Sequence, residues 1–257
     1  MNTLITGASS GVGEAIAVEC AKRGDNLFIC GRDAVRLENV RRKCLESGAG
    51  DVFAEILDVT DEKAVRDWLE RCDEKHPLER IFSNAGIGTG IEDEKNVRAT
   101  WATNVNGNLN VVLPAIDIFR RRAKAPHRQI LITASIAGYG PLASCPAYSA
   151  TKSAMKTWAL ALRGMLKKEG IAVSAICPGF IRSRITDRNT CPMPFFMEAD
   201  KAAKIIVDRA QRNVGLIAFP WPMRLATWFL STLPFRLNEF INSLLPAKTS
   251  KTTPTPF

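Results

Sequence analysis

Short runs of β-branched and other apolar residues alternate along this chain with longer stretches in which apolar positions recur at helical spacing. The short runs predict strands at residues 3–6, 26–30, 52–57, 80–83, 129–133, 171–176 and 214–219. The longer stretches predict helices at about 12–23, 34–47, 61–74, 95–121, 147–168 and 199–212. Because parallel strands need a crossover between them, this alternation predicts an α/β fold with a doubly wound parallel β-sheet of about seven strands, flanked by helices on both faces.

Residues 1–221 contain no linker rich in glycine, serine or proline, so we interpret them as one domain. Residues 222–247 predict an amphipathic helical extension in which Pro234 separates two short helices. Their apolar residues are Leu225, Trp228, Phe229 and Leu233 in the first helix and Leu237, Phe240, Ile241, Leu244 and Leu245 in the second. Such an apolar surface must be covered by the protein core, a second subunit, a substrate or a membrane surface. The tail at 248–257 is too polar to order itself and is expected to be disordered.

Composition narrows the class of protein. The chain has 257 residues, 46% of them apolar and 24% charged, which is typical of a globular protein that needs no covalent staple. Its seven cysteines include no C-x-x-C pair, and only two histidines are present, so we expect reduced thiols, a cytoplasmic location and no metal site. The longest apolar region, 214–235, is broken by prolines and is not expected to span a membrane.

The formal net charge of +9 raises the question of a nucleic-acid partner. The basic residues cluster at 41–43 and at 120–128, but neither cluster is interleaved with the aromatic residues that stack on bases. We interpret both clusters as solvated helix faces and expect no nucleic-acid binding.

A glycine-rich loop follows the first predicted strand and opens the first predicted helix. Its glycines, Gly7, Gly11 and Gly13, permit a tight turn and a close approach of the backbone to a pyrophosphate, which the N–H groups of the helix N-terminus bind. The residues predicted to contact a dinucleotide here are Gly7, Ser9, Ser10, Gly11, Val12 and Gly13. A strand before this loop and a helix after it indicate a Rossmann fold.

The end of the second strand decides which dinucleotide is bound. An acidic residue in this region would hold the ribose hydroxyls of NAD, but Gly31 occupies that position. The next residue, Arg32, can pair with the 2′-phosphate of NADP, whereas Asp33 is better explained as a helix N-cap. The sequence therefore favours NADP(H), although Ser10 stands where a basic residue would strengthen this prediction.

Tyr148 and Lys152 are four residues apart in a helical pattern, so their side chains lie on one face of the helix. An ammonium beside a phenol lowers the pKa of the phenol, which lets a tyrosine act as an acid or a base. Ser135 follows the fifth strand, where its hydroxyl can hold a carbonyl oxygen. Because the carboxyl ends of parallel strands form the ligand-binding edge, these residues are predicted to be catalytic.

With these motifs in order, the chain resembles the short-chain dehydrogenase/reductase family over about residues 3–220. The residues that carry the resemblance are Thr6, Gly7, Gly11, Gly13, Asp58, Asn84, Ala85, Gly86, Asn104, Ser135, Tyr148, Lys152, Pro178 and Gly179. The resemblance implies that Asp58 and Val59 contact the adenine and that Asn84, Ala85 and Gly86 lie under the cofactor. It also implies that Tyr148 and Lys152 contact the cofactor as well as the substrate, and that Asn104 holds a water in a proton relay. Pro178, Gly179, Ile181 and Ser183 would lie near the nicotinamide.

The resemblance implies an NADP(H)-dependent oxidoreductase that interconverts a carbonyl and an alcohol, assembled as a homodimer or homotetramer. The segment from 180 to 197 corresponds to a substrate loop, and its Met193, Phe195, Phe196 and Met197 suit a lipophilic ligand. We expect the extension at 222–247 to help close that pocket, with a weak membrane-surface contact as the next interpretation. The alternative function is an NADP(H)-binding regulatory sensor without turnover.

Overall fold

The computed structural model describes residues 1–122, 125–187 and 192–244. Seven parallel strands form one sheet in the order β3-β2-β1-β4-β5-β6-β7, which confirms the predicted doubly wound fold. The strands are β1 (Asn2–Thr6), β2 (Asn26–Gly31), β3 (Val52–Ile56), β4 (Arg80–Ser83), β5 (Gln129–Thr133), β6 (Ala172–Pro178) and β7 (Leu216–Phe219). The strand order changes direction between β1 and β4, and a ligand crevice is expected at that point.

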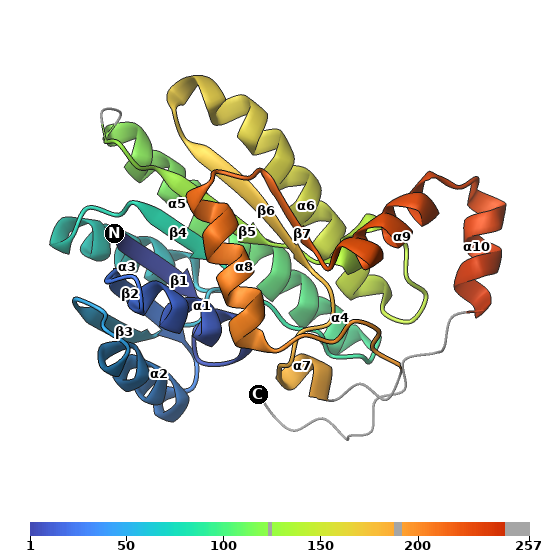
Figure 1. The fold of residues 1–257 in the computed structure, drawn as a ribbon, viewed down its shortest axis with the longest axis horizontal. Coiled ribbons are helices and arrows are strands. Elements are labelled where there is room, and N and C mark those ends of the chain that lie inside the picture. The colour runs from blue at the N-terminus through green and yellow to red at the C-terminus, as the bar shows by residue number, and fades with distance from the viewer. Residues whose placement is uncertain (123–124, 188–191, 245–257) are drawn as a thin grey trace.

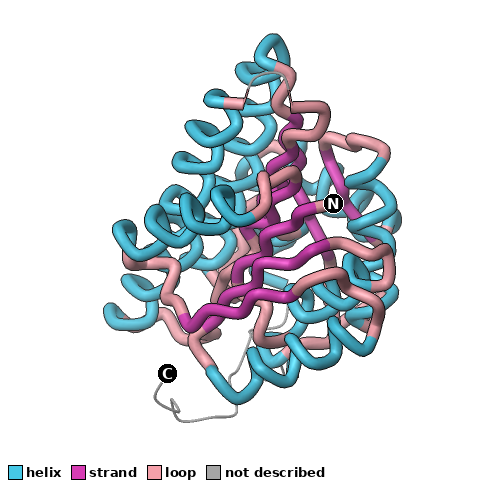
Figure 2. Tube along the Cα trace, turned by 90° about the vertical axis from the view of Figure 1, so that its left-hand side faces the viewer, coloured by secondary structure: helices cyan, strands magenta, loops and turns pink. Residues whose placement is uncertain are grey.

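Helices cover both faces of the sheet (Figures 1 and 2). Two hydrophobic clusters fill the two interfaces, one beneath α3, α5 and α6 and the other beneath α1, α2 and α8. The helices are α1 (Gly11–Ala21), α2 (Ala34–Glu46), α3 (Glu62–Lys75), α4 (Glu94–Trp101), α5 (Gly107–Arg121), α6 (Pro146–Leu166), α7 (Arg184–Asp187), α8 (Ala199–Gln211), α9 (Trp221–Thr232) and α10 (Phe235–Leu244). Two of the predicted helix ends are clear, because Gly24 and Gly170 both adopt the left-handed backbone that terminates a helix.

One predicted helix differs from the structure in a way that matters for the site. The single helix expected at 95–121 consists of α4 and α5 joined by a π-helical turn at Ala102–Asn106. Asn104 lies in this turn and hydrogen-bonds through its side chain to the backbone N–H and carbonyl of Ile87. The spacing of apolar residues cannot reveal such a turn, because one extra residue in a single turn barely changes the helical period.

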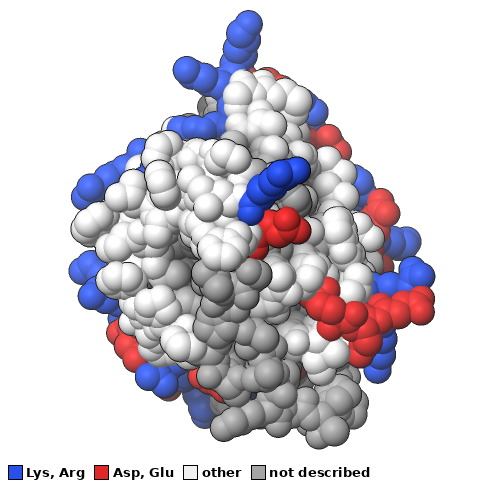
Figure 3. Space-filling model, turned by 90° about the vertical axis from the view of Figure 1, so that its right-hand side faces the viewer, with Lys and Arg blue, Asp and Glu red and all other residues white. Residues whose placement is uncertain are grey.

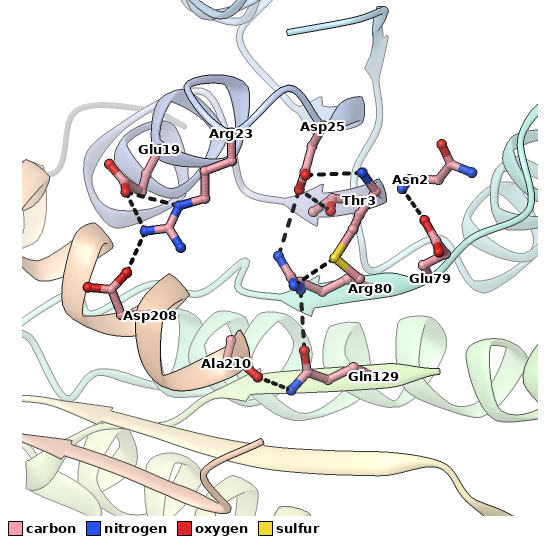
Figure 4. Close-up of polar contacts among 11 residues, drawn as sticks. Asn2, Thr3, Glu19, Arg23, Asp25, Glu79, Arg80, Gln129, Asp208 and Ala210 are labelled. Carbon is pink, nitrogen blue, oxygen red and sulfur yellow. Dashed lines mark hydrogen bonds and ion pairs between the residues drawn. The ribbon is translucent and has the colours of Figure 1, made fainter. Parts of the chain in front are cut away.

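A buried polar network holds the amino edge of the sheet together (Figure 4). Arg80 on β4 is only 2% exposed and lies 3.7 Å from the carboxylate of Asp25. Its guanidinium donates to Gln129 on β5, and the Gln129 amide donates to the carbonyl of Ala210 on α8. Thr3 on β1 donates to Asp25 at 2.7 Å. Three strands and one helix are thus joined at the edge opposite the expected ligand crevice.

The extension after β7 forms the two helices α9 and α10, separated at Leu233 and Pro234 as predicted. Helix α9 contains no buried residue, and α10 is attached to it by a hydrogen bond from the Asn238 amide to the Leu230 carbonyl. Both helices extend beyond the sheet at the right of Figure 1. Core packing, the first alternative for this segment, therefore finds no support in α9. Leu245 and the tail at 248–257 lie outside the described residues.

Candidate active site

A pocket of about 290 Å³ opens at the carboxyl edge of the sheet, where β1 and β4 diverge. Its lining contains almost every residue predicted to bind a dinucleotide or to be catalytic. These are Gly7, Ser9, Ser10, Gly11, Val12, Arg32, Asp58, Val59, Asn84, Ala85, Gly86, Ser135, Tyr148, Lys152, Pro178, Gly179, Ile181 and Ser183. Of the predicted site residues, only Gly13 and Asn104 are absent from the lining. The pocket therefore joins the residues predicted to bind a dinucleotide and those predicted to be catalytic in one site.

The glycine loop is packed too closely to accept side chains. A Cβ on Gly7 would lie 2.8 Å from the Cα of Ala85, and the φ of Gly7 is +65°. A Cβ on Gly13 would collide with the carbonyl oxygen of Gly7, so Gly13 allows α1 to approach the loop rather than lining the pocket. The backbone of this loop therefore forms the pocket wall, with the N-terminus of α1 directed at the space where a diphosphate would lie.

Charged side chains gather at the far end of the glycine loop. Asp33 caps α2 by accepting a hydrogen bond from the Arg36 N–H at 2.9 Å, as predicted. Arg32 lies 3.5 Å from the carboxylate of Asp58, which also accepts hydrogen bonds from Thr60. Burial opposes a low pKa for Asp58, but the bonds from Thr60 and the charge of Arg32 outweigh it and lower the pKa. Arg32 is half exposed and faces the pocket, a geometry that suits an anionic group.

The space at Gly31 is limited by Ser9 of the glycine loop. A Cβ at this position would lie 2.9 Å from both the Cβ and the Oγ of Ser9. Any larger residue, including the acid that would hold the ribose hydroxyls of NAD, requires Ser9 to move.

The three predicted catalytic residues meet at the other end of the pocket. Tyr148 and Lys152 lie on α6, and the hydroxyl of Ser135 hydrogen-bonds with that of Tyr148. Lys152 is 3% exposed, donates to the carbonyl of Thr133 at 2.8 Å, and holds its Nζ 5.8 Å from the Tyr148 ring centroid. A carbonyl placed against Ser135 would therefore meet both a hydrogen-bond donor and a transferable proton.

One expectation about this group is wrong. We expected Lys152 to lower the pKa of Tyr148, but burial raises the pKa of Tyr148 to about 12, with the Ser135 hydrogen bond acting in the opposite direction. Burial also lowers the pKa of Lys152 to about 8. Desolvation outweighs attraction between the two groups, because the Lys152 ammonium bonds to a backbone carbonyl rather than to the phenol. At neutral pH Tyr148 is therefore protonated.

Asn104 lies behind the catalytic residues rather than on the pocket wall. It is fully buried, and besides its two bonds to Ile87 it donates to Thr151 on α6 at 3.1 Å. A Cβ on Gly86 would lie 3.1 Å from both the Asn104 side chain and Lys152, so this glycine lets the three elements converge. Asn104 thus ties the π-helical turn, the loop after β4 and α6 together. Its predicted role in a proton relay stays a prediction.

Glu92 was not found by sequence reasoning. Its carboxylate accepts hydrogen bonds from the N–H of Ala147 at 3.1 and 3.2 Å, in the first turn of α6. The N-cap residue, Cys145, makes no capping bond with its own side chain. The two partners are 55 residues apart, so no local signal marks the contact. Glu92 is a positioning residue that fixes the N-terminus of α6, one residue before Tyr148.

Several pocket residues have no sequence signal of their own. Arg36, Leu57, Ile87, Gly88, Thr103, Thr133, Ala134 and Thr186 also line the pocket. Arg36 lies in the first turn of α2 and pairs with Asp33 at 2.8 Å, and nothing in the sequence pattern marks it as a pocket residue. Ser183 bonds with Thr186, which joins α7 to the pocket wall.

Three further findings concern the part of the chain that the structure describes. None of its His, Cys, Asp and Glu residues form a cluster of three able to hold a metal ion. None of its helices is long and apolar enough to cross a membrane. Its six described cysteines are buried and free, and Cys191 lies outside the described residues.

Comparisons with known proteins agree with this geometry. The sequence profile of the short chain dehydrogenase family matches residues 1–192. A protein of Myxococcus xanthus named an uncharacterized oxidoreductase is 34% identical over 240 residues, which cover 90% of this chain and 92% of that one. A short-chain dehydrogenase from Sphingobium yanoikuyae in complex with NADPH has a TM-score of 0.77 at 25% identity, covering 98% of this chain and 99% of that one.

A short chain dehydrogenase from Mycobacterium paratuberculosis, solved bound to NAD, shares the fold. Its TM-score is 0.73 at 20% identity, covering 85% of this chain and 94% of that one. Solved structures of this fold thus include complexes with both dinucleotides. From the profile match over most of its length and from the geometry of its pocket, this chain belongs to the short-chain dehydrogenase/reductase family of oxidoreductases.

Proposed function

We propose that this protein is an NADP(H)-dependent oxidoreductase that interconverts a ketone or aldehyde and an alcohol, on a lipophilic substrate. The observation that carries the proposal is the meeting of Ser135, Tyr148 and Lys152 at one end of a pocket whose other end is the glycine loop. This arrangement supports hydride transfer with general acid–base assistance better than it supports binding alone, since binding requires no proton donor.

The residues fit a dinucleotide. The glycine loop and the N-terminus of α1 would hold the diphosphate, and Arg32 beside Asp58 would lie at the adenosine end. Gly86 leaves space that a Cβ would fill next to Lys152, at the nicotinamide end. A bound nicotinamide dinucleotide would supply or accept the hydride.

The remaining chemistry belongs to the side chains of this protein. In the reducing direction Ser135 donates a hydrogen bond to the substrate oxygen, and Tyr148 gives that oxygen a proton. The raised pKa of Tyr148, about 12, agrees with a residue that enters this step protonated. Lys152, one turn away on α6, stabilises the negative charge that remains on the phenol.

Arg32 carries the preference for NADP(H). Its guanidinium faces the pocket, and an acid at residue 31 would require the Ser9 side chain to move. The NADPH complex of the Sphingobium yanoikuyae relative supports this choice, while the NAD complex of the Mycobacterium paratuberculosis protein requires that both cofactors be tested.

The lipophilic substrate is inferred from the segment next to the pocket. Met197 pairs through a β-bridge with Ile181 on the pocket lining, and Phe195, two residues earlier, is 57% exposed. Neither Phe195 nor Met197 is itself on the lining. Aromatic and thioether side chains beside a pocket favour apolar ligands.

The test is NADPH oxidation measured against a panel of aldehydes, short ketones and long-chain or polycyclic ketones. We expect turnover that increases with the apolar size of the substrate. Tight NADPH binding without oxidation on any carbonyl, together with no reduction of NADP by the matching alcohols, would favour the sensor function instead.

A further inference from the structure

The outward face of the C-terminal extension is apolar although nothing in the described chain covers it. Trp221, Leu225, Trp228 and Phe229 are 73%, 55%, 54% and 57% exposed, respectively. At about 100° per residue these four positions fall within one stripe of α9 roughly 100° wide. On α10, Leu237 and Phe240 add 46% and 61% exposed side chains. A helix on the surface of a globular protein normally presents polar residues on its solvent-facing side.

The inward side of α9 already has its contacts. Met223 lies against Gly179, and α9 packs against the turn at Ile136–Tyr139 and against β7. The outward stripe is therefore additional to the surface that attaches α9 to the domain. In the described residues no member of α9 or α10 lines the pocket, so the exposed stripe is not itself a pocket wall.

The charges on α9 and α10 are few and mainly basic. They are Arg224, Arg236 and Glu239. Arg224 lies near the Tyr139 hydroxyl, and neither arginine forms an ion pair with a described carboxylate. Figure 3 shows a mostly uncharged area at this end, interrupted near its centre by a basic and an acidic side chain, with Lys and Arg along its upper and left margins and acidic residues mainly at the right.

We propose that α9 and α10 form a docking face for the surface of a lipid bilayer that contains anionic lipids. Trp221, Trp228, Phe229 and Phe240 would enter the headgroup boundary, where aromatic side chains are favoured. Arg224 and Arg236 would meet lipid phosphates, which supply an opposite charge that the described carboxylates do not provide. No membrane-spanning segment is needed, because interfacial helices bind through one face only.

A second copy of the chain fits this face less well. In a two-fold interface the same patch meets itself, so Arg224 and Arg236 of one copy would approach those of the other. Each copy contributes only one acid from these helices, Glu239, to offset them. A bilayer has no such conflict.

The direct experiment is sedimentation of the full-length protein with phosphatidylcholine vesicles, with and without phosphatidylglycerol. We expect binding that increases with the anionic lipid and weakens with salt. Trp228→Glu should weaken binding about tenfold or more, since it places a charge in the headgroup boundary. The matched control is Val35→Glu, which adds the same charge at a 73% exposed residue of α2. Circular dichroism melting of both variants is the check that they are folded.

Tryptophan fluorescence locates the contact independently of activity. Vesicles should shift the emission of the wild-type protein to the blue, and Trp221→Phe/Trp228→Phe should bind vesicles but lose most of that shift. Three results overturn the proposal: no vesicle binding by the wild type, unchanged binding by Trp228→Glu, or a dimer in the absence of lipid that Trp228→Glu converts to a monomer. The last result would assign the face to a second copy. None of these readouts depends on the cofactor or the reaction, so the docking face and the proposed function can fail separately.

Discussion

The two walls of the pocket are built in opposite ways. The nucleotide wall, at the ends of β1, β4 and β5, has its polar groups bonded within the chain: the Thr6 hydroxyl receives the N–H groups of Asn84 and Ala85, and Lys152 bonds to Thr133. The opposite wall, at Gly179, is backed by Met223 of α9, a helix that does not itself line the pocket and in which no residue is buried. The first wall is organised before any ligand arrives, whereas the second depends for its environment on what it contacts. A common chemistry can thus be kept on a rigid wall while substrate choice varies on the other.

The comparison is tested most severely by removing the proton donor from the rigid wall. Tyr148→Phe keeps the ring and removes the hydroxyl, so turnover should fall about a hundredfold or more with NADPH affinity nearly unchanged. Tyr139→Phe is the matched control, because Tyr139 is the other of the two tyrosines in the sequence and does not line the pocket. Near-normal turnover of Tyr148→Phe, measured by NADPH oxidation, would contradict the mechanism.

The cost of burying Lys152 should appear as a pH effect on stability. Its pKa is lowered to about 8 in the folded chain, so between about pH 8 and 10.5 the unfolded chain binds more protons than the folded chain. The free energy of unfolding therefore gains a term that rises with pH across this window and is absent in Lys152→Met. Urea unfolding at several pH values should show the difference between wild type and variant growing from about pH 8 to 10.

The control for this measurement is Lys63→Met, which removes an ammonium that is 87% exposed. The hydrogen bond to Asp67 raises the pKa of Lys63, so the difference of this variant from the wild type should not grow with pH over the same window. A flat difference for Lys152→Met as well would mean that the Lys152 ammonium is well solvated.

A smaller effect is expected at the adenosine end. Arg32→Ala should remove most of an NADPH preference of about tenfold over NADH, because it deletes the cation that can meet the 2′-phosphate. Arg41→Ala, also on this side of the fold but paired with Glu38 outside the pocket, should leave the preference intact. Fluorescence titration with both cofactors provides the measurement. Equal affinities in the unmutated protein would rule out Arg32 as the source of selectivity.

The smallest effect tests how the rigid wall is held. Glu92→Gln weakens the acceptor at the N-terminus of α6 and should lower kcat about two- to fivefold with the KM for NADPH unchanged. Glu94→Gln is the control, since Glu94 pairs with Arg98 on α4 and its side chain is 78% exposed. A change in thermal stability without a change in kcat would make Glu92 purely structural.

The parts that were predictable follow from local rules. Gly7, Gly11, Tyr148 and Lys152 are placed by local backbone geometry, and all four line the pocket. Gly13 was predicted to contact the dinucleotide but lies behind the loop. The Asp33 cap is equally local.

The parts that were missed depend on contacts between distant segments. Glu92 reaches α6 across 55 residues, the π-helical turn follows from the bonds of Asn104 to Ile87, and the pKa of Tyr148 reflects burial rather than its neighbour on the helix. The contacts of α9 could not be predicted either, because an apolar stripe has the same sequence pattern whether it faces a core or a membrane.

The close approach of Gly31 to Ser9 has a consequence for how this protein can evolve. A side chain at residue 31 would lie 2.9 Å from the Cβ and Oγ of Ser9, so an acid introduced there requires Ser9 to shift or to become smaller. On the proposed preference for NADP(H), we expect Gly31→Asp alone to bind NADH less tightly than Gly31→Asp combined with Ser9→Gly. A search for variants with altered cofactor use should therefore vary residues 9 and 31 together.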